Sequence, residues 1–229
     1  MNTKQGDLII GHLEVNRFLY GLDFMNMNEE CLKQISKVLA NWSDADVRTV
    51  PNVMYQVRCG NDENDPGIEY QINWFMNCAE TFIHNHRHSF DSLCLEGEYT
   101  ESIWEVVHDD SIIYEFLRRS DNTFDEPKKI SGRLCHVRSR HHFPNNILHV
   151  DTGLFHSITA KEGDDTNDKR VLTFLAKRKY SFVQKMCVLS SSPTIDSLDD
   201  DMRMATEVER KEVYDKLIET IMIRYHYSQ

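Results

Sequence analysis

Apolar and polar positions alternate through most of the chain between residues 50 and 180, as they do in strands with one buried face. In the clearest run, Ile68 to Cys78, one face carries Ile68, Tyr70, Ile72, Trp74 and Met76. Further short strands are predicted over residues 53–59, 89–96, 99–107, 112–118, 130–138, 147–150, 156–159 and 171–176. Turn signals separate these runs, among them Asp109-Asp110, and no helical run lies between them. The pattern predicts a mainly β chain folded as a sandwich or small barrel.

Helical spacing of apolar residues is confined to the two ends of the pattern. Residues 28–42 form an amphipathic run that Asn28 can cap, and we expect this helix to pack on the outside of the sheet. A last helix is predicted over residues 202–225, with a buried stripe of Met204, Val208, Leu217, Ile221 and Tyr225. The predicted organisation is a single domain, 1–229, made of a helical cover (1–45), a barrel (46–189), and a linker with the C-terminal helix (190–229).

Composition narrows the classes of partner. The 229 residues carry a formal net charge of −11, which disfavours nucleic acid and anionic membrane surfaces. No secretory signal and no apolar stretch long enough to span a membrane is apparent. The six cysteines include no C-x-x-C pair, so we expect reduced, mostly buried thiols in a cytoplasmic protein.

The histidines are clustered. Nine of the eleven lie between His84 and His156, and imidazole is a common ligand of transition metals. In the segment T-F-I-H-N-H-R-H, the alternation of a strand would point His84 and His86 to one side, and His88 continues the series. Two such imidazoles can hold one metal ion together with a third ligand from another strand. His141 and His142 are predicted to lie in an exposed loop.

These residues resemble the two sequence motifs of the cupin superfamily, a group of small β-barrels built as double-stranded β-helices. The first motif would be His84-Asn85-His86, with Asp91 near the place of the family's glutamate and Gly97 at a turn that starts a hairpin. The second would be Gly153 followed by His156. The resemblance covers roughly residues 50–180. It implies a cupin-like barrel with a metal held by His84, His86 and His156.

Within the cupins the chain looks most similar to the cysteine dioxygenase group of thiol dioxygenases. The resemblance lies in Tyr55-Gln56-Val57-Arg58, a loop, an apolar strand, and then Ile83-His84-Asn85-His86. It implies that Arg58 binds the carboxylate of a small substrate, because the planar fork of donors in a guanidinium group matches the two oxygens of a carboxylate. The chain departs from the group at two places: Leu175 stands near the position of the active-site tyrosine, and Asp91 replaces a cysteine that some members cross-link.

Three residues have open roles. Asp91 is interpreted as a fourth ligand, as an acceptor that orients an imidazole, or as an exposed strand carboxylate. His88 and His149 are candidates for the metal or for positions beside it. Because His149 lies seven residues before His156, a continuous strand would point the two to opposite faces, but Gly153 allows a bend.

The implied function is that of a mononuclear non-heme iron dioxygenase. Three neutral ligands on one side of an Fe(II) ion leave positions for a small, carboxylate-bearing substrate and O2. Another divalent transition metal would also suit three imidazoles. The alternatives are a non-catalytic cupin module that binds a metal or small molecule, and a cupin isomerase or lyase. Cupins often pair through their sheets, so a homodimer is consistent with the resemblance.

Overall fold

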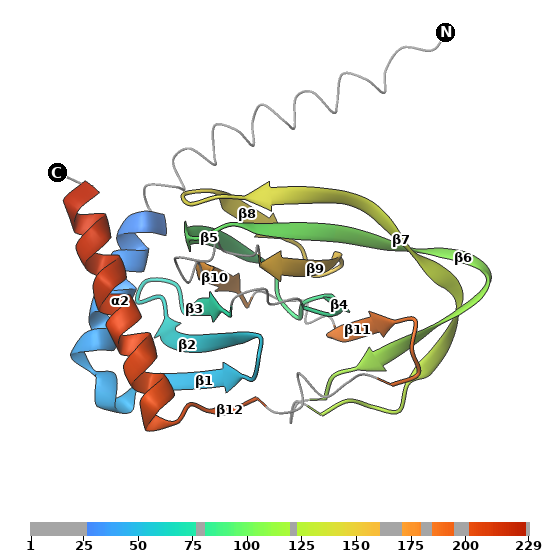
Figure 1. The fold of residues 1–229 in the computed structure, drawn as a ribbon, viewed down its shortest axis with the longest axis horizontal. Helices are drawn as coiled ribbons and strands as arrows, with labels where there is room; N and C mark the ends of the chain where they lie inside the picture. The colour runs from blue at the N-terminus through green and yellow to red at the C-terminus, as the bar shows by residue number, and fades with distance from the viewer. Residues whose placement is uncertain are drawn as a thin grey trace, which may run out of the picture.

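A computed structural model describes residues 27–76, 81–119, 123–160, 171–179, 185–194 and 202–227. Its strands form two antiparallel sheets (Figure 1). The first contains, in spatial order, β12 (Arg203–Met204), β1 (Asp46–Val50), β2 (Met54–Asn61), β3 (Ile68–Phe75), β10 (Leu172–Arg178), β5 (Phe90–Glu96) and β8 (Ile147–Val150). The second contains β11 (Cys187–Ser190), β4 (Ile83–His84), β9 (Phe155–Ala160), β6 (Tyr99–Leu117) and β7 (Lys128–His142).

The two faces of the seven-stranded sheet have different neighbours. Along β3, Tyr70, Ile72 and Trp74 pack in the main apolar core beneath the helices. The alternate residues of β3 line a cavity between the two sheets. Both faces of this strand are therefore buried. The face that carries Tyr70, Ile72 and Trp74 lies toward the helices, and the other face lies toward the interior of the barrel.

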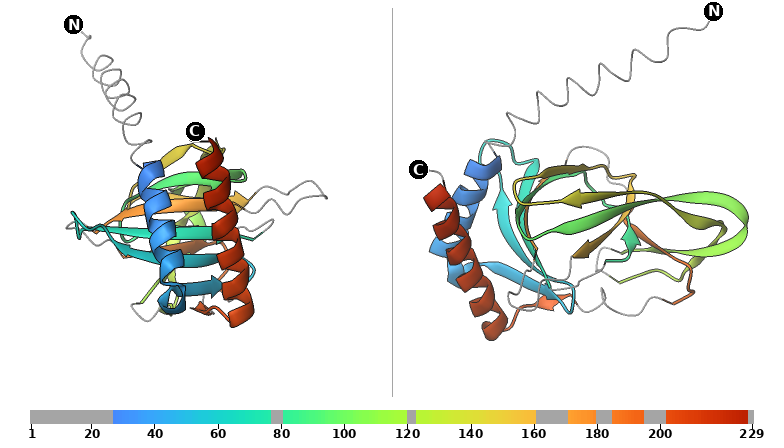
Figure 2. Two further views of the ribbon diagram at one scale, coloured as in Figure 1. Left: turned by 90° about the vertical axis from the view of Figure 1, so that its left-hand side faces the viewer. Right: turned by 45° about the horizontal axis from the view of Figure 1, so that its top comes forward.

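Two helical segments cover the outer face of the seven-stranded sheet, side by side (Figure 2). They are residues 27–40 and α2 (Glu207–Tyr227), and a short 3-10 turn follows the first at Trp42–Asp44. Ile35 and Leu217 are among the most buried apolar side chains of the two, at 0% and 1% exposure. The Arg210 guanidinium donates hydrogen bonds to the carbonyl oxygens of Trp42 and Ala45, at 2.6 and 2.7 Å, and so joins α2 to the chain entering β1.

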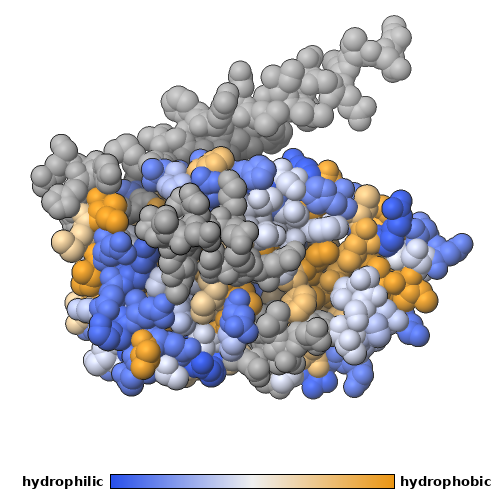
Figure 3. All heavy atoms as spheres, viewed as in Figure 1, coloured by the Kyte–Doolittle hydropathy of each residue, from blue (hydrophilic) through white to orange (hydrophobic). Residues whose placement is uncertain are grey.

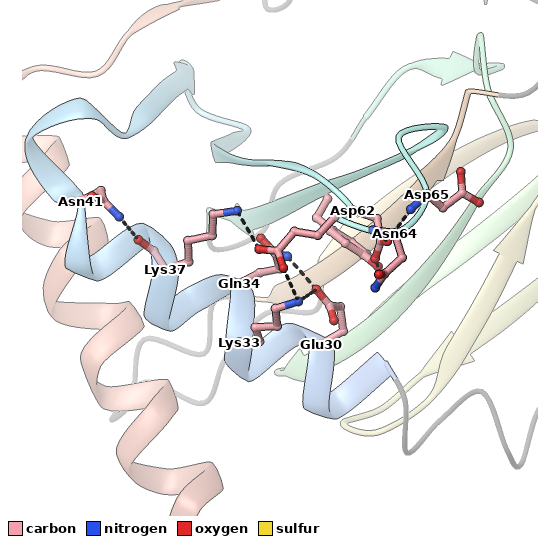
Figure 4. A network of polar contacts seen from close by, with 10 residues as sticks. Glu30, Lys33, Gln34, Lys37, Asn41, Asp62, Asn64 and Asp65 are labelled. Atoms are coloured by element: carbon pink, nitrogen blue, oxygen red, sulfur yellow. Dashed lines mark hydrogen bonds and ion pairs between the residues drawn. The ribbon is translucent and has the colours of Figure 1, made fainter.

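The loop between β2 and β3 is attached to the N-terminal helical segment (Figure 4). Lys33 and Lys37 each lie 3.4 Å from a carboxylate oxygen of Glu63 in that loop. Asp62 orders the loop itself, because its carboxylate accepts hydrogen bonds from the backbone N–H groups of Asn64 and Asp65, both at 2.8 Å. Such exposed ion pairs contribute little free energy, so their effect is to fix where the loop lies.

The β6–β7 pair forms a long arm that extends beyond the body of the barrel (Figure 1). The predicted turn at Asp109-Asp110 is wrong, because β6 continues through it. Residues 108–111 instead form a bulge opposite Gly132, whose φ of +146° and approach to the Val107 carbonyl leave no room for a side chain. Exposed apolar side chains lie along the arm at Val107, Ile112 and Val137, and Figure 3 shows apolar surface at this end of the molecule.

The prediction of a mainly β chain, folded as a small barrel with an N-terminal and a C-terminal helix, is confirmed. The helix bounds differ from those expected. Residue 27 is already helical, so Asn28 does not cap the first helix, which ends at residue 40. Met204 belongs to β12, and Val208 is 79% exposed because the buried side of α2 is formed by Val213, Leu217 and Thr220.

Two further outcomes concern turns and thiols. Gly97 does adopt a turn conformation, with a φ of +75°, but β5 and β6 belong to different sheets. The expected hairpin is therefore a corner that carries the chain from one side of the barrel to the other. Five of the cysteines lie among the described residues, none of them in a disulfide and four of them buried, and Cys78 lies outside those residues.

Candidate metal centre

Three histidine side chains converge on the inner wall of the second sheet. The possible ligand nitrogens of His84, His86 and His156 all lie within 4.8 Å of one another. The Nε2 atoms of His86 and His156 are 2.8 Å apart. Among the described residues this is the only group of three or more histidine, cysteine or carboxylate side chains close enough to share an ion. Sequence and structure agree on these three positions.

The backbone pairing explains the convergence. His84 lies in β4 directly opposite His156 in β9, so the two side chains project from neighbouring strands to the same side. Asn85 points the other way, and its buried side-chain oxygen accepts a hydrogen bond from the backbone N–H of Cys187, at 2.7 Å. This bond attaches the segment to β11 and turns His86 back toward His84. The strand ends at His84, and a bend at residues 87–88 follows, so the alternation does not continue to His88.

A buried carboxylate orients the third histidine. Glu101 is fully buried, and its Oε1 lies 2.7 Å from His156 Nδ1. An ionised carboxylate can only accept, so Nδ1 carries the proton and Nε2 presents its lone pair toward the other two imidazoles. Carboxylates that hold metal-binding histidines in this way are a common feature of metal sites. The sequence analysis missed Glu101.

Two further groups lie around Glu101. Its Oε2 is 2.8 Å from Arg140 Nε and 3.7 Å from His142 Nε2, both from β7. Burial opposes ionisation of the carboxyl group, but the His142 and His156 imidazoles and the Arg140 charge outweigh it and lower the pKa of Glu101 to about 2. His142 is buried at 6% exposure and stacks on Tyr99, so its predicted place in an exposed loop is wrong.

The ligand histidines are held in the form that binds metals. Burial, followed by the neighbouring His156, lowers the pKa of His84 to about 3. Burial and the two other imidazoles also hold the pKa of His86 well below its usual value. Both rings are therefore neutral at pH 7, and neutral imidazole is the metal-binding form.

The donor set fits a transition-metal ion. Two nitrogens bound at about 2.0–2.1 Å to one ion and at right angles to each other are about 3 Å apart. The 2.8 Å between His86 Nε2 and His156 Nε2 is close to that separation. Three imidazoles without a thiolate or a carboxylate suit iron, zinc, copper or nickel better than calcium or magnesium. The geometry does not select among these transition metals.

The three histidines open onto the cavity between the sheets. Its volume is about 270 Å³, near the lower end of pockets that hold small molecules. Apolar walls come from both sheets and include Phe90, Leu148, Val150, Ile158 and Leu175. The phenyl ring of Phe90 stands edge-on to His86, with ring centroids 4.7 Å apart. No residue of the N-terminal helical segment lines this cavity, in keeping with its predicted role as an outer cover.

Asp91 and His149 do not join the three histidines. They are paired residues on β5 and β8, and their neighbours Phe90, Ser92, Leu148 and Val150 face the cavity. Asp91 and His149 therefore project from the opposite face of the sheet, where His149 Nδ1 lies 2.6 Å from the Asp91 carboxylate and Arg178 also pairs with it. His88 is outside the three-histidine group as well. The interpretations of these three residues as ligands are not supported by their positions.

Arg58 lies at the rim of the same cavity. It is on the inward-facing side of β2, and its side chain is 49% exposed. Its Nε is 3.7 Å from an Asp46 carboxylate oxygen, a long pair in solvent. The Arg58 side chain therefore borders the cavity, and its contact with a substrate stays a prediction.

Comparisons with known proteins give distant structural matches alone. No protein-family model matches the sequence, and no curated protein matches it. Among solved structures, a cupin superfamily protein from Desulfitobacterium hafniense is 13% identical over 56% of this chain and 78% of its own, with a TM-score of 0.31. An RmlC-like cupin from Shewanella frigidimarina is 15% identical over 61% of this chain and 88% of its own, with a TM-score of 0.33.

Other matches span less of the solved protein. The oxalate decarboxylase of Lactobacillus farciminis is 11% identical over 72% of this chain and 35% of its own, with a TM-score of 0.37. The chain spans 56% of the cysteine peptidase Peruvianin-I from Thevetia peruviana latex. At these identities and TM-scores the similarity identifies neither a family nor an activity. Within the described residues, no helix combines the length and hydropathy needed to cross a membrane.

Proposed function

We propose that the protein is a cupin-type metalloenzyme, a mononuclear non-heme iron dioxygenase that acts on a small, carboxylate-bearing substrate. The observation that carries the proposal is the convergence of His84, His86 and His156, without any thiolate or carboxylate among them, on the wall of a small cavity. Neutral ligands that share one side of an ion leave its other side for small molecules.

Each part of the site has a separate task. His84, His86 and His156 hold the ion, and Glu101 keeps His156 in the tautomer that presents Nε2. When bound, Fe(II) supplies the redox chemistry and the template for O2 and substrate. The apolar residues of the cavity exclude bulk water and limit the size of the substrate, and Leu175 is among them where thiol dioxygenases have a tyrosine. A dioxygenase reaction here would have to proceed without that phenol.

The direct test is anaerobic reconstitution of the metal-free protein with Fe(II), followed by measurement of O2 uptake with a panel of small amino and thiol carboxylates. We expect one iron per chain and O2 consumption that depends on one class of carboxylate. Turnover of a substrate with a redox-inert metal would contradict oxygenation and favour an isomerase or lyase. Metal binding without any turnover would favour a non-catalytic module.

Replacement of Arg58 by lysine tests the carboxylate interaction at the rim. Lysine keeps the charge but loses the fork of parallel donors, so we expect the apparent KM to rise about tenfold. The increase is modest because half of the side chain is exposed to solvent. The iron content should not change.

The matched control is Arg48→Lys. Arg48 pairs with the same Asp46, through two hydrogen bonds of 2.8 and 3.0 Å, but does not line the cavity. An equal rise of KM in both variants would show that the arginines act on Asp46 and not on the substrate.

A further inference from the structure

The wall of the cavity that belongs to the first sheet is unexpectedly polar. Four buried side chains of β3, β5 and β10 face the cavity with polar groups: Gln71, Asn73, Ser92 and Thr173. A barrel interior that served only packing would be apolar, because a buried amide without a partner costs free energy. Polar groups at this depth suit a ligand that carries a polar group of its own.

A directed chain of hydrogen bonds runs along this wall. Lys177 Nζ donates to Gln71 Oε1, and Gln71 Nε2 donates to Asn73 Oδ1 at 2.5 Å. Lysine has no acceptor, so it fixes the orientation of the Gln71 amide, and that amide in turn fixes Asn73. The Asn73 Nδ2 group is left as a donor, and no described residue accepts a hydrogen bond from it. The wall therefore faces the cavity with donors.

Lys177 brings a positive charge that the protein does not neutralise by contact. Among the described residues no carboxylate lies within ion-pair distance of Lys177, and its neighbour Glu69 pairs with Lys179 instead. Burial lowers the pKa of Lys177 to about 8. The Glu69 carboxylate opposes this shift, and the Arg58 and Lys179 charges add to it, so the amine is still charged at pH 7. Lys177 lines the same cavity as His84, His86 and His156.

We propose that Lys177 and Asn73, on the wall of the cavity formed by β3 and β10, form together with Arg58 at the rim the subsite for the carboxylate of the ligand. The carboxylate accepts hydrogen bonds from Lys177 Nζ and Asn73 Nδ2, both of which are charged or polarised donors. Lys177 then determines specificity for a carboxylate over its neutral amide. The proposal relies on the proposed function only for what happens at the other end of the ligand, beside the three histidines.

The experiment measures binding of butyrate, with butyramide as the neutral analogue, to the metal-free protein by titration calorimetry. Lys177→Met keeps most of the length of the side chain and removes the charge, and we expect it to weaken butyrate binding at least about tenfold, as loss of a charge-assisted pair does. Butyramide should bind all forms equally weakly. Lys179→Met is the matched control, since Lys179 directly follows the same strand, pairs with Glu69 and does not line the cavity.

A second readout uses the unaltered chain and so does not depend on the folding of a variant. In amide NMR spectra, the Asn73 side-chain resonances, assigned by comparison with Asn73→Ser, should shift with butyrate and not with butyramide. Unchanged Asn73 resonances, or equal butyrate affinity of Lys177→Met and the unaltered chain, would overturn the proposal. If the protein binds butyrate through Lys177 but does not bind iron, only the proposed function fails.

Discussion

Replacing His84 by alanine is expected to reduce the affinity for Fe(II) or Zn²⁺ at least about a hundredfold while the chain stays folded. A structural zinc site releases about 10–16 kcal/mol over four ligands, so one ligand accounts for about 2.5–4 kcal/mol. His84 is the best of the three ligands for this test. Its Nδ1 lies 2.8 Å from the Phe82 carbonyl oxygen, so the substitution leaves no buried charge behind.

The readouts are metal content after dialysis against a competing chelator and the circular dichroism spectrum. The same loss of metal is expected for His86→Ala and His156→Ala. His136→Ala is the matched control, because His136 is exposed on β7 and does not line the cavity; its ring bonds to Ser139 and contacts Trp104. Retention of the metal by the His84 variant, or its equal loss from the His136 variant, would contradict the assignment of the ligands.

Glu101→Gln is expected to lower metal affinity about 10–100-fold without removing a ligand. The amide of a glutamine at this position has two orientations. In one, its N–H group faces the N–H group of His156 Nδ1, and in the other its uncharged oxygen accepts a weaker hydrogen bond. The His156 tautomer is then less well fixed, and the Arg140 guanidinium 2.8 Å away loses its counter-ion. Removing one partner of a buried pair also destabilises the fold, here by about 1–3 kcal/mol because Arg140 is partly exposed.

Metal titration and urea unfolding, measured on the same preparation, separate the two effects. Glu105→Gln, four residues along the same strand and exposed, is the control and should change neither quantity. If Glu101→Gln were to lose stability but keep full metal affinity, Glu101 would be a structural carboxylate and not the residue that positions His156.

The histidine ligands could be predicted from the sequence because their signal is local. His84 and His86 are two residues apart, and that spacing places them on one side of an extended segment. His156 required the resemblance to a known motif, since nothing local shows that β9 pairs with β4. Glu101 had a local signal that was missed: it lies between the buried residues Tyr99 and Ile103, on the inward-facing side of its strand.

The roles left open by the sequence belong to strands whose two faces are both buried. Asp91 and His149 lie in apolar strands, and alternation alone does not tell the face toward the helices from the face toward the cavity. Their pairing, Asp91 opposite His149, joins residues 58 positions apart and satisfies both side chains away from the metal centre. The bulge at residues 108–111 was mistaken for a turn because turns and bulges favour the same residue types.

The most direct test of the central claim is a crystal of the protein loaded with Fe(II), with diffraction data measured on both sides of the iron absorption edge. We expect one anomalous difference peak per chain, bonded to nitrogen atoms of His84, His86 and His156 at about 2.0–2.2 Å. A peak at Asp91 and His149 on the outer face of the sheet, or no peak in protein that was loaded with iron, would contradict the three-histidine metal centre.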